Sequence, residues 1–486
     1  MLQSLAAILY LLSGAIALMV LFQYLRAKVD ILSLRNLFLL GFIVFQSNNA
    51  ARVMWIEYFG EYPVVDPQTT GLKFVFMSIL FLAVFLAAYH SGIFVSKFAA
   101  SRAKAYRTPS VTSMLTLAVV FVLSGVVCRM VLAKLPVPLF PQVFMPIGSG
   151  LVFVAVAIAG GSWAPRAFNP VIGGIAAGIV VMAMIPIIGD FSRREILGLS
   201  MAFLWGAYHA HWKFLNPGAA LMRLAAVGAA GAMLLAAHTA IRGAFIGKEV
   251  PIGEVVRMLM GAQIRDGATD LASGQDAGAI SMWLIETRPE QYSYDTLHTA
   301  RLLITHPVPR MVYPEKPIAL AQMVPKQSGS IAFKAETYNV GPGIIGHIAN
   351  DNPWLALAPY AIFLGLFLRL LDDLVKWNAA NPFVLLPIGV GLGQIVALAR
   401  GETGHFLFMG MLNMLGAYVA MQVFVRLMTT FGFTMRYDEH PMDDGEEWDG
   451  GEEPSYSDDG HGWEQQELAA IEHAQHADYG SDQRST

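Results

Sequence analysis

The chain has 486 residues, of which 55% are hydrophobic and only 14% are charged. A soluble globular domain carries nearer a quarter charged residues, so this composition excludes an ordinary water-soluble protein and indicates a membrane protein. The single cysteine, Cys128, excludes an internal disulfide framework and a metal site built from several cysteines.

Apolar runs long enough to cross a bilayer recur along most of the chain. The first run has no basic leading segment and no cleavage site of small residues, so we interpret it as a span and not as a signal peptide. The sequence therefore predicts an all-α polytopic membrane protein with eleven transmembrane helices. These predicted spans lie at 3–24, 36–57, 72–95, 112–134, 141–161, 168–188, 195–212, 218–240, 354–371, 381–400 and 404–428.

Lysine and arginine in alternate short loops set the predicted orientation, because such loops face the cytoplasm. The loops after the first and third spans are basic, and the loop after the second, with Glu57, Glu61 and Asp66, is acidic. We therefore expect the N-terminus outside and the C-terminal tail inside. That tail is strongly acidic: residues 437–486 carry a net charge of −15 and the rest +11. Its composition predicts disorder, and Asp372 and Asp373 are expected as a solvated pair on the cytoplasmic side.

Residues 241–352 form a connection of 112 residues that we predict on the outward face, with short helices lying over the membrane. The predicted organisation is four parts. Residues 1–240 hold helices one to eight, 241–352 the large extracytoplasmic loop, 353–430 helices nine to eleven, and 431–486 the acidic cytoplasmic tail.

Arginines stand near the outer ends of the spans that run from inside to outside, where the orientation rule disfavours them. They are Arg52, Arg129, Arg193 with Arg194, Arg242 and Arg400. One such arginine is commonly an interfacial residue, but together they predict an outward cavity that attracts anions. Guanidinium suits phosphate because its planar fork donates two hydrogen bonds and stays charged. The polar run Gln46–Asn49 just inside Arg52 also requires a protein or water cavity.

Two motifs lie within the large loop. The first runs from Thr305 to Pro317, Thr-His-Pro-Val-Pro-Arg-Met-Val-Tyr-Pro-Glu-Lys-Pro. The second runs from Ala335 to Gly346, Ala-Glu-Thr-Tyr-Asn-Val-Gly-Pro-Gly-Ile-Ile-Gly, and leads into an apolar span.

Over about 50 residues these motifs resemble the repeat-unit polymerases of O-antigen and oligosaccharide synthesis, the Wzy-type family. Its members show Pro-Arg-x-x-x-Pro-x-Lys-Pro, and then Gly-Glu-x-Tyr-x-x-x-Gly-x-x-Gly before a span. Ala335 replaces the usual glycine, and Arg242-Gly243 matches a pair that the family places before the loop. The resemblance implies a GT-C-like membrane fold in the bacterial cytoplasmic (inner) membrane, and an enzyme that joins polyprenyl-diphosphate-linked oligosaccharides on its outer face.

Such a reaction needs cations at the leaving diphosphate and an acceptor for the hydroxyl proton. The implied catalytic residues are Arg310, Glu336 and His405, with His347 as a further candidate base. An ion pair of Arg310 with Glu315 or Glu336 is the structural alternative. The implied diphosphate- and sugar-binding residues are Arg52, Arg242, Arg310, Lys316, Tyr338 and Arg400.

The resemblance implies no metal and no other cofactor. The expected partners are the lipid-linked oligosaccharide and membrane lipid, with a chain-length regulator and a flippase as further candidates, and no nucleic acid.

Two alternatives stay open. One is another lipid-linked glycan transferase, either an O-antigen ligase with the same chemistry or a metal-dependent enzyme using Glu57, Glu61 or Asp66. The other is a polysaccharide or lipid transporter. A transporter is disfavoured because the charges cluster at outer ends and in one loop, and not near the bilayer midplane.

Overall fold

The computed structural model describes residues 1–102, 109–137, 140–187, 193–241, 252–273, 276–329 and 341–431. Within these ranges the regular elements are all helices, and no strand is formed. Helices suit a long apolar segment in lipid because they satisfy every backbone polar group within the segment.

Eight helical segments in the described ranges are long and apolar enough to cross a membrane. They are α1 (Leu2–Leu25), the continuous run of α2 (Leu34–Phe42), η1 (Ile43–Ser47) and α3 (Asn48–Ile56), then α4 (Pro67–Ser91), α6 (Val111–Met130) with η2 (Leu132–Lys134), α7 (Phe140–Trp163) with η3 (Ala164–Arg166), α10 (Pro217–Ile241), α17 (Pro353–Trp377) and α20 (Thr403–Thr430). The membrane character of the chain thus agrees with its composition.

Four further helices coincide with three predicted spans without meeting those criteria. The helix α8 (Pro170–Met184) and the pair α18 (Pro382–Val390) and α19 (Leu392–Ala397) are apolar but short. The helix α9 (Arg193–Ala210) opens with two arginines and a glutamate. The count of eleven spans therefore stays a prediction.

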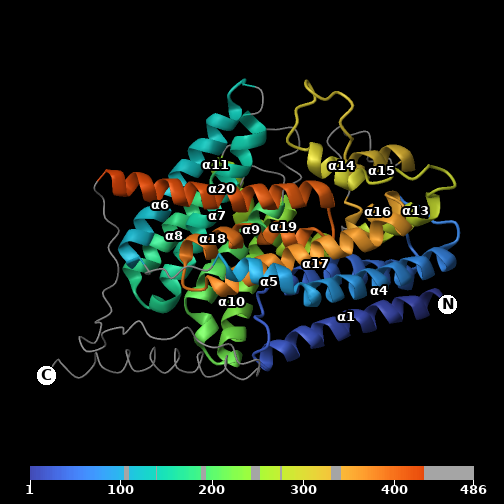
Figure 1. The fold of residues 1–486 in the computed structure, drawn as a ribbon, viewed down its shortest axis with the longest axis horizontal. Helices are drawn as coiled ribbons and strands as arrows, with labels where there is room; N and C mark the ends of the chain where they lie inside the picture. The colour runs from blue at the N-terminus through green and yellow to red at the C-terminus, as the bar shows by residue number, and fades with distance from the viewer. Residues whose placement is uncertain are drawn as a thin grey trace.

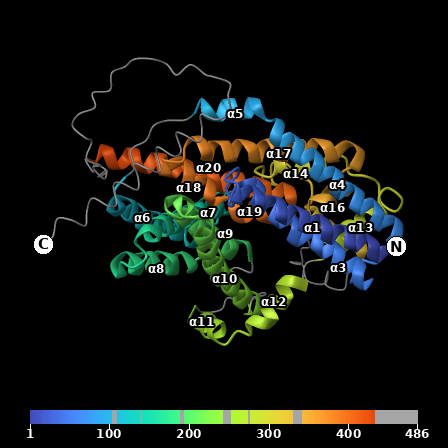
Figure 2. The ribbon, with the colours of Figure 1, turned by 90° about the horizontal axis from the view of Figure 1, so that it is seen from below.

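The remaining helices are shorter, and most stand between α10 and α17. They are α5 (Ile93–Ala100), α11 (Ile252–Met260), α12 (Ile264–Ser273), α13 (Ala277–Thr287), α14 (His298–Thr305), α15 (Leu320–Ser328) and α16 (Gly343–Asn350), besides the turns η3 (Ala164–Arg166) and η4 (Trp212–Phe214). Helices α11 and α12 pack on α10 (Figure 2). Helices α13 to α16 gather at the end of the bundle that holds the N-terminus (Figure 1); we call these four helices the roof.

Each of the first three roof helices begins against a side chain from another part of the chain. Asn49 Oδ1 accepts the Gly278 N–H at the start of α13, at 2.9 Å. Asp351 Oδ2 accepts the Thr299 N–H of α14 at 2.7 Å, and Glu402 Oε2 accepts the Ala321 N–H of α15 at 2.8 Å. The residues that precede these helices make no side-chain cap of their own. The roof is therefore stabilised by long-range caps on amide groups that a helix leaves unsatisfied.

A long-range cap is also formed at the opposite end of the bundle, and it corrects the expectation that Asp372 and Asp373 are solvated. Asp372 is not solvated: its carboxylate accepts the backbone N–H groups of Leu34 and Arg35, at 2.7 and 3.2 Å, and the Tyr89 hydroxyl at 2.8 Å. It therefore caps α2 from within α17. Asp373 is also buried, and its carboxylate pairs with Arg369 at 2.6 Å.

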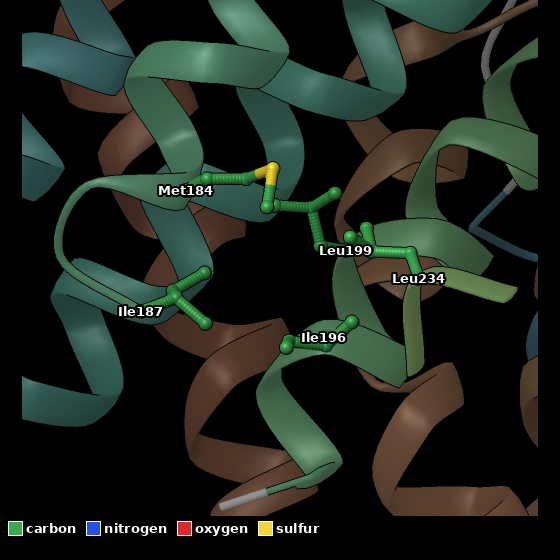
Figure 3. A pocket seen from close by; sticks show the side chains of 5 residues that line it. All are labelled: Met184, Ile187, Ile196, Leu199 and Leu234. Carbon is green, nitrogen blue, oxygen red and sulfur yellow. The ribbon is translucent and has the colours of Figure 1, made fainter. Parts of the chain in front are cut away.

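Small residues allow the central helices to approach closely. A Cβ at Gly206 of α9 would overlap the carbonyl oxygen of Ala157 of α7, so only glycine permits this distance between the two backbones. A pocket between α8, α9 and α10 is lined by Met184, Ile187, Ile196, Leu199 and Leu234 (Figure 3). These side chains carry no polar group, so the pocket has nothing with which to recognise a sugar or a phosphate.

Gly206→Ala tests this close approach, with Gly174→Ala on α8 as the matched control. We expect Gly206→Ala to lower the free energy of unfolding by about 1–3 kcal/mol, because the added methyl forces α7 and α9 apart. A Cβ at Gly174 meets nothing within 4 Å, so the control should be neutral or slightly stabilising. Thermal unfolding in detergent measures both, and equal midpoints would contradict the packing argument.

Candidate functional site

Residues 305–317, which connect α14 to α15 and carry the first motif, form a loop braced by its own two cations. We call it the cation loop. Lys316 Nζ donates to the carbonyl oxygens of His306 and Val308, at 2.6 and 3.1 Å. The Arg310 guanidinium donates to the carbonyl oxygens of Lys316 and Pro317, at 3.0 and 3.3 Å. Both side chains hold the backbone of the loop in place through neutral carbonyl groups, which leave the positive charges of the side chains in place.

The two cations of this loop lie near each other, and neither has a carboxylate partner among the described residues. The predicted Arg310–Glu315 ion pair is therefore not formed, and the other predicted partner, Glu336, lies outside the described residues. Burial, and then the positive charge of Arg310, lower the pKa of Lys316. Two unneutralised cations held at one place make a site that favours an anion.

A pair of histidines lies beside the cation loop. His306 Nε2 is 3.1 Å from His405 Nδ1, in the first turn of α20, so one imidazole donates a hydrogen bond to the other. The His306 ring also contacts Phe408, with ring centroids 4.8 Å apart. Burial, and then Lys316, lower the pKa of His306 to about 4, so this imidazole is uncharged at neutral pH.

His306 is the functional candidate that the sequence reasoning missed. It stands within the first motif, one residue before Pro307, but its pairing with His405 depends on where α20 begins, 99 residues away. The only available signal was its place in the same motif as Arg310 and Lys316. The structure thus brings three predicted residues, Arg310, Lys316 and His405, together around a fourth.

The predicted ring of arginines is only partly available to an anion. The Arg194 guanidinium lies 4.5 Å from the centroid of the Phe406 ring, next to His405. Arg52 is exposed on α3. Arg129, in contrast, is buried and pairs with Glu195 at 2.9 Å, so it neutralises a carboxylate inside the protein. Arg129 is therefore not available to an anion, and the cavity predicted from the other arginines stays a prediction.

Arg400 lies with the polar run of the second predicted span and the glycines of the second motif. Its guanidinium is 5.6 Å from the centroid of the Phe45 ring. Gln46 Nε2 donates to the Pro342 carbonyl oxygen at 3.2 Å, so the polar run faces protein and not lipid. Gly343 has a φ of +67°, and its N–H donates to the Gly401 carbonyl oxygen at 3.3 Å. Glycine is needed there because other residues rarely adopt that φ.

Within the roof, His347 of α16 belongs to a buried hydrogen-bonded group. Its Nε2 accepts the Thr403 N–H at 3.1 Å, so Nδ1 carries the proton and donates to Thr299 Oγ1 at 2.8 Å. Its side chain is completely buried. His347, a candidate base from the sequence, therefore has no face toward a substrate and positions the roof instead.

Glu402 completes this buried group. Its Oε1 lies 3.5 Å from His347 Nε2 and has no hydrogen-bond partner, while Oε2 caps α15. Burial raises the pKa of Glu402 to about 8 and lowers the pKa of His347 to about 3. Both side chains are therefore uncharged at neutral pH, as their enclosure by apolar groups requires.

Three predicted site residues, Arg242, Glu336 and Tyr338, lie outside the described residues. Within the described ranges, no group of three or more histidine, cysteine, aspartate or glutamate side chains is arranged to hold a metal ion. Asp66, a residue of the metal-dependent alternative, accepts the Thr69 N–H and caps α4. Among the described residues, the cation loop and the histidine pair supply groups of the kind that suit an anion and a proton acceptor.

The raised pKa of Glu402 predicts how stability depends on pH. The folded pKa lies above the ordinary value of 4.5, so the folded state binds more protons and loses stability as pH rises toward 8. His347 acts in the opposite direction, but only below its ordinary pKa of 6.5. Between pH 6.5 and 8 we therefore expect wild type to lose up to about 2 kcal/mol through Glu402.

Glu402→Gln should remove this loss, because glutamine mimics the protonated acid and can still accept the Ala321 N–H. Its unfolding midpoint should exceed that of wild type at pH 8 and change less from pH 6.5. The exposed Glu315→Gln serves as control. A wild-type midpoint that rises over this interval, or no difference between Glu402→Gln and Glu315→Gln, would show that Glu402 is ionised in the folded protein.

Comparison with known proteins finds no family model, no curated protein and no solved structure that matches this chain. The resemblance to repeat-unit polymerases therefore stands on the two motifs, and the function is inferred from the site.

Proposed function

We propose that this protein is a membrane glycosyltransferase that joins lipid-diphosphate-linked oligosaccharide repeat units into a polymer. The observation that carries the proposal is the cation loop beside the histidine pair: Arg310 and Lys316 without a described carboxylate partner, next to His306 and His405. This combination suits a reaction in which a diphosphate leaves while a hydroxyl loses its proton.

In the proposed reaction, a sugar hydroxyl of the acceptor unit attacks the anomeric carbon of the donor chain. A new glycosidic C–O bond forms as the C–O bond to the diphosphate breaks, and the diphosphate takes the bonding electrons. The hydroxyl proton passes to an imidazole and from there to water. The products are a chain lengthened by one unit and free polyprenyl diphosphate.

Arg310 and Lys316 would stabilise the diphosphate as its charge grows in the transition state. Arg310 spends two hydrogen bonds on backbone carbonyl groups of the loop. A guanidinium has five N–H donors, so three remain for phosphate oxygens. Because the loop is held by these bonds before substrate arrives, little reorganisation is needed at the moment of reaction.

His405 would accept the hydroxyl proton, with His306 holding its ring in position. A base must be unprotonated to act, and a histidine beside cations meets that condition at neutral pH. The low pKa of His306 fits this requirement. Arg194 and Arg400 would extend the cationic surface, and Glu336, Tyr338, Arg242 and Arg52 complete the set that the motifs suggest.

The distribution of lysine and arginine among the short loops suggests the orientation. The site would face outward from the cytoplasmic membrane, and the acidic tail would lie in the cytoplasm. No metal or other cofactor is assigned a role. An O-antigen ligase would use the same residues, but it would transfer a finished glycan once, so the length distribution of the product separates the two reactions.

Arg310→Ala tests the proposal directly. In a strain lacking the gene, this variant should reach the membrane at wild-type level but yield single repeat units in place of a ladder of long chains. We expect a rate loss of about 10²–10³-fold, as for removal of one preorganised donor. Arg310→Lys should recover part of the activity, because it keeps the charge and loses the fork.

The matched control is Arg301→Ala on α14, an exposed arginine that pairs with Asp295 outside the cation loop. It should give the wild-type ladder on a gel of surface polysaccharide. A normal ladder from Arg310→Ala would refute the assigned role of the cation loop. A ladder lost equally in Arg301→Ala would show only that the roof is sensitive to substitution.

The histidine pair makes a separate prediction. His405→Asn should slow chain lengthening in membrane vesicles by about 10²–10⁴-fold, while the exposed His90→Asn should have no effect. Because the pKa of His306 is about 4, this imidazole gains no proton between pH 8 and 6 and its hydrogen bond to His405 is kept, so the wild-type rate should not fall there. A rate that halves near pH 6.5 would indicate an ordinary histidine as the base.

A further inference from the structure

We propose that the tip of the cation loop, Met311 and Val312, inserts into the lipid surface at the roof end of the bundle. The inference is independent of the proposed enzymatic function, because it concerns how the loop meets the bilayer and not what the site transforms. It stands on three observations: where the base of the loop lies, which side chains its tip exposes, and which charges flank them.

The base of the loop lies at the level where a membrane-spanning helix begins. His306 contacts His405 and Phe408, which belong to the first two turns of α20, and the apolar span starts at Thr403. Exposed Trp55 and Trp354 stand at the same end of their own spans, where tryptophan commonly marks the membrane–water boundary. The loop therefore leaves the protein at this boundary.

The loop also extends in a direction that carries it over lipid. In Figure 1, α17 and α20 run along the width of the picture. The segment between α14 and α15 projects sideways from that direction, away from the bundle and beyond the roof helices. A segment that leaves a membrane helix sideways at the boundary remains in the interfacial layer.

The side chains at the tip are apolar and exposed. Met311 is 83% exposed and Val312 is 73% exposed, and Ile304 at the base of the loop is 74% exposed. Prolines 307, 309, 314 and 317 and the four carbonyl bonds of Arg310 and Lys316 hold this segment. A braced loop cannot fold its tip back onto the roof, so these side chains leave water only by entering lipid.

The charges beside the tip fit the phosphate layer of a bilayer. Arg310 is exposed next to Met311, and its guanidinium donates to the carbonyl oxygen of Lys316, so the two cations lie together beside the tip. Neither has a carboxylate partner in the described part of the chain. An apolar tip beside two cations suits a surface of anionic phospholipids, in which acyl chains meet the tip and phosphates meet the cations.

Site-directed spin labelling of the full-length protein in nanodiscs tests this insertion. The chain has one cysteine, so Cys128→Ser gives a background in which Met311→Cys and Val312→Cys are labelled singly. Collision rates with oxygen, which concentrates in lipid, and with a water-soluble nickel complex report the depth of each label. Leu415→Cys, exposed on the middle of α20, gives the lipid reference, and Glu290→Cys, exposed on the roof, gives the water reference.

We expect the ratio of oxygen to nickel collision rates at 311 and 312 to exceed that at 290 several-fold and to approach that at 415. The measurement uses phosphatidylcholine nanodiscs and nanodiscs that also contain phosphatidylglycerol. A higher ratio with phosphatidylglycerol, reduced by Arg310→Gln together with Lys316→Gln, would confirm the role of the cations. Ratios at 311 and 312 equal to that at 290 in both lipids would overturn the proposal, whatever the glycan ladders show.

Discussion

A group of buried, uncharged side chains at the first turn of α20 joins the roof to the membrane helices. Both ring nitrogens of His347 form hydrogen bonds, one with Thr299 of α14 and one with Thr403 of α20. Glu402 caps α15 by accepting the Ala321 N–H. Hydrogen bonds of this kind are strong where water is absent, and a missing partner is costly. The position of the roof, and hence of the cation loop that leaves it, depends on this group being complete.

The histidine pair and the cation loop lie next to this buried group along the chain. Glu402 caps α15 and lies beside His347, and His405, three residues later in the first turn of α20, contacts His306. The start of α20 therefore carries a structural carboxyl group and, three residues on, a candidate base. A carboxylic acid kept neutral by burial can stand this close to a cationic site without neutralising it, which preserves the positive charge that an anionic substrate requires.

The long apolar helices were predictable because length and hydrophobicity are local properties of the sequence. Short helices in 241–352 were also expected, but not how the roof is held in place, because the caps of α13, α14 and α15 come from Asn49, Asp351 and Glu402, which lie outside those helices. Arg310, Lys316 and His405 could be selected from motif and charge. That these residues lie around His306, and that Arg129 forms an ion pair with Glu195, could not be predicted. Both depend on distances between helices that no pattern in the sequence encodes.

The long-range caps also set an order of assembly. Asn49 precedes the start of α13 by more than 200 residues, whereas Glu402 follows Ala321 by 81 residues and stands at the start of the last membrane helix. During synthesis, α13 can find its cap as soon as it emerges, but α15 has none until Glu402 is made. The roof is therefore completed only after the membrane helices that precede α20 have been made, and a nascent chain that stops short of residue 402 leaves α15 without its cap.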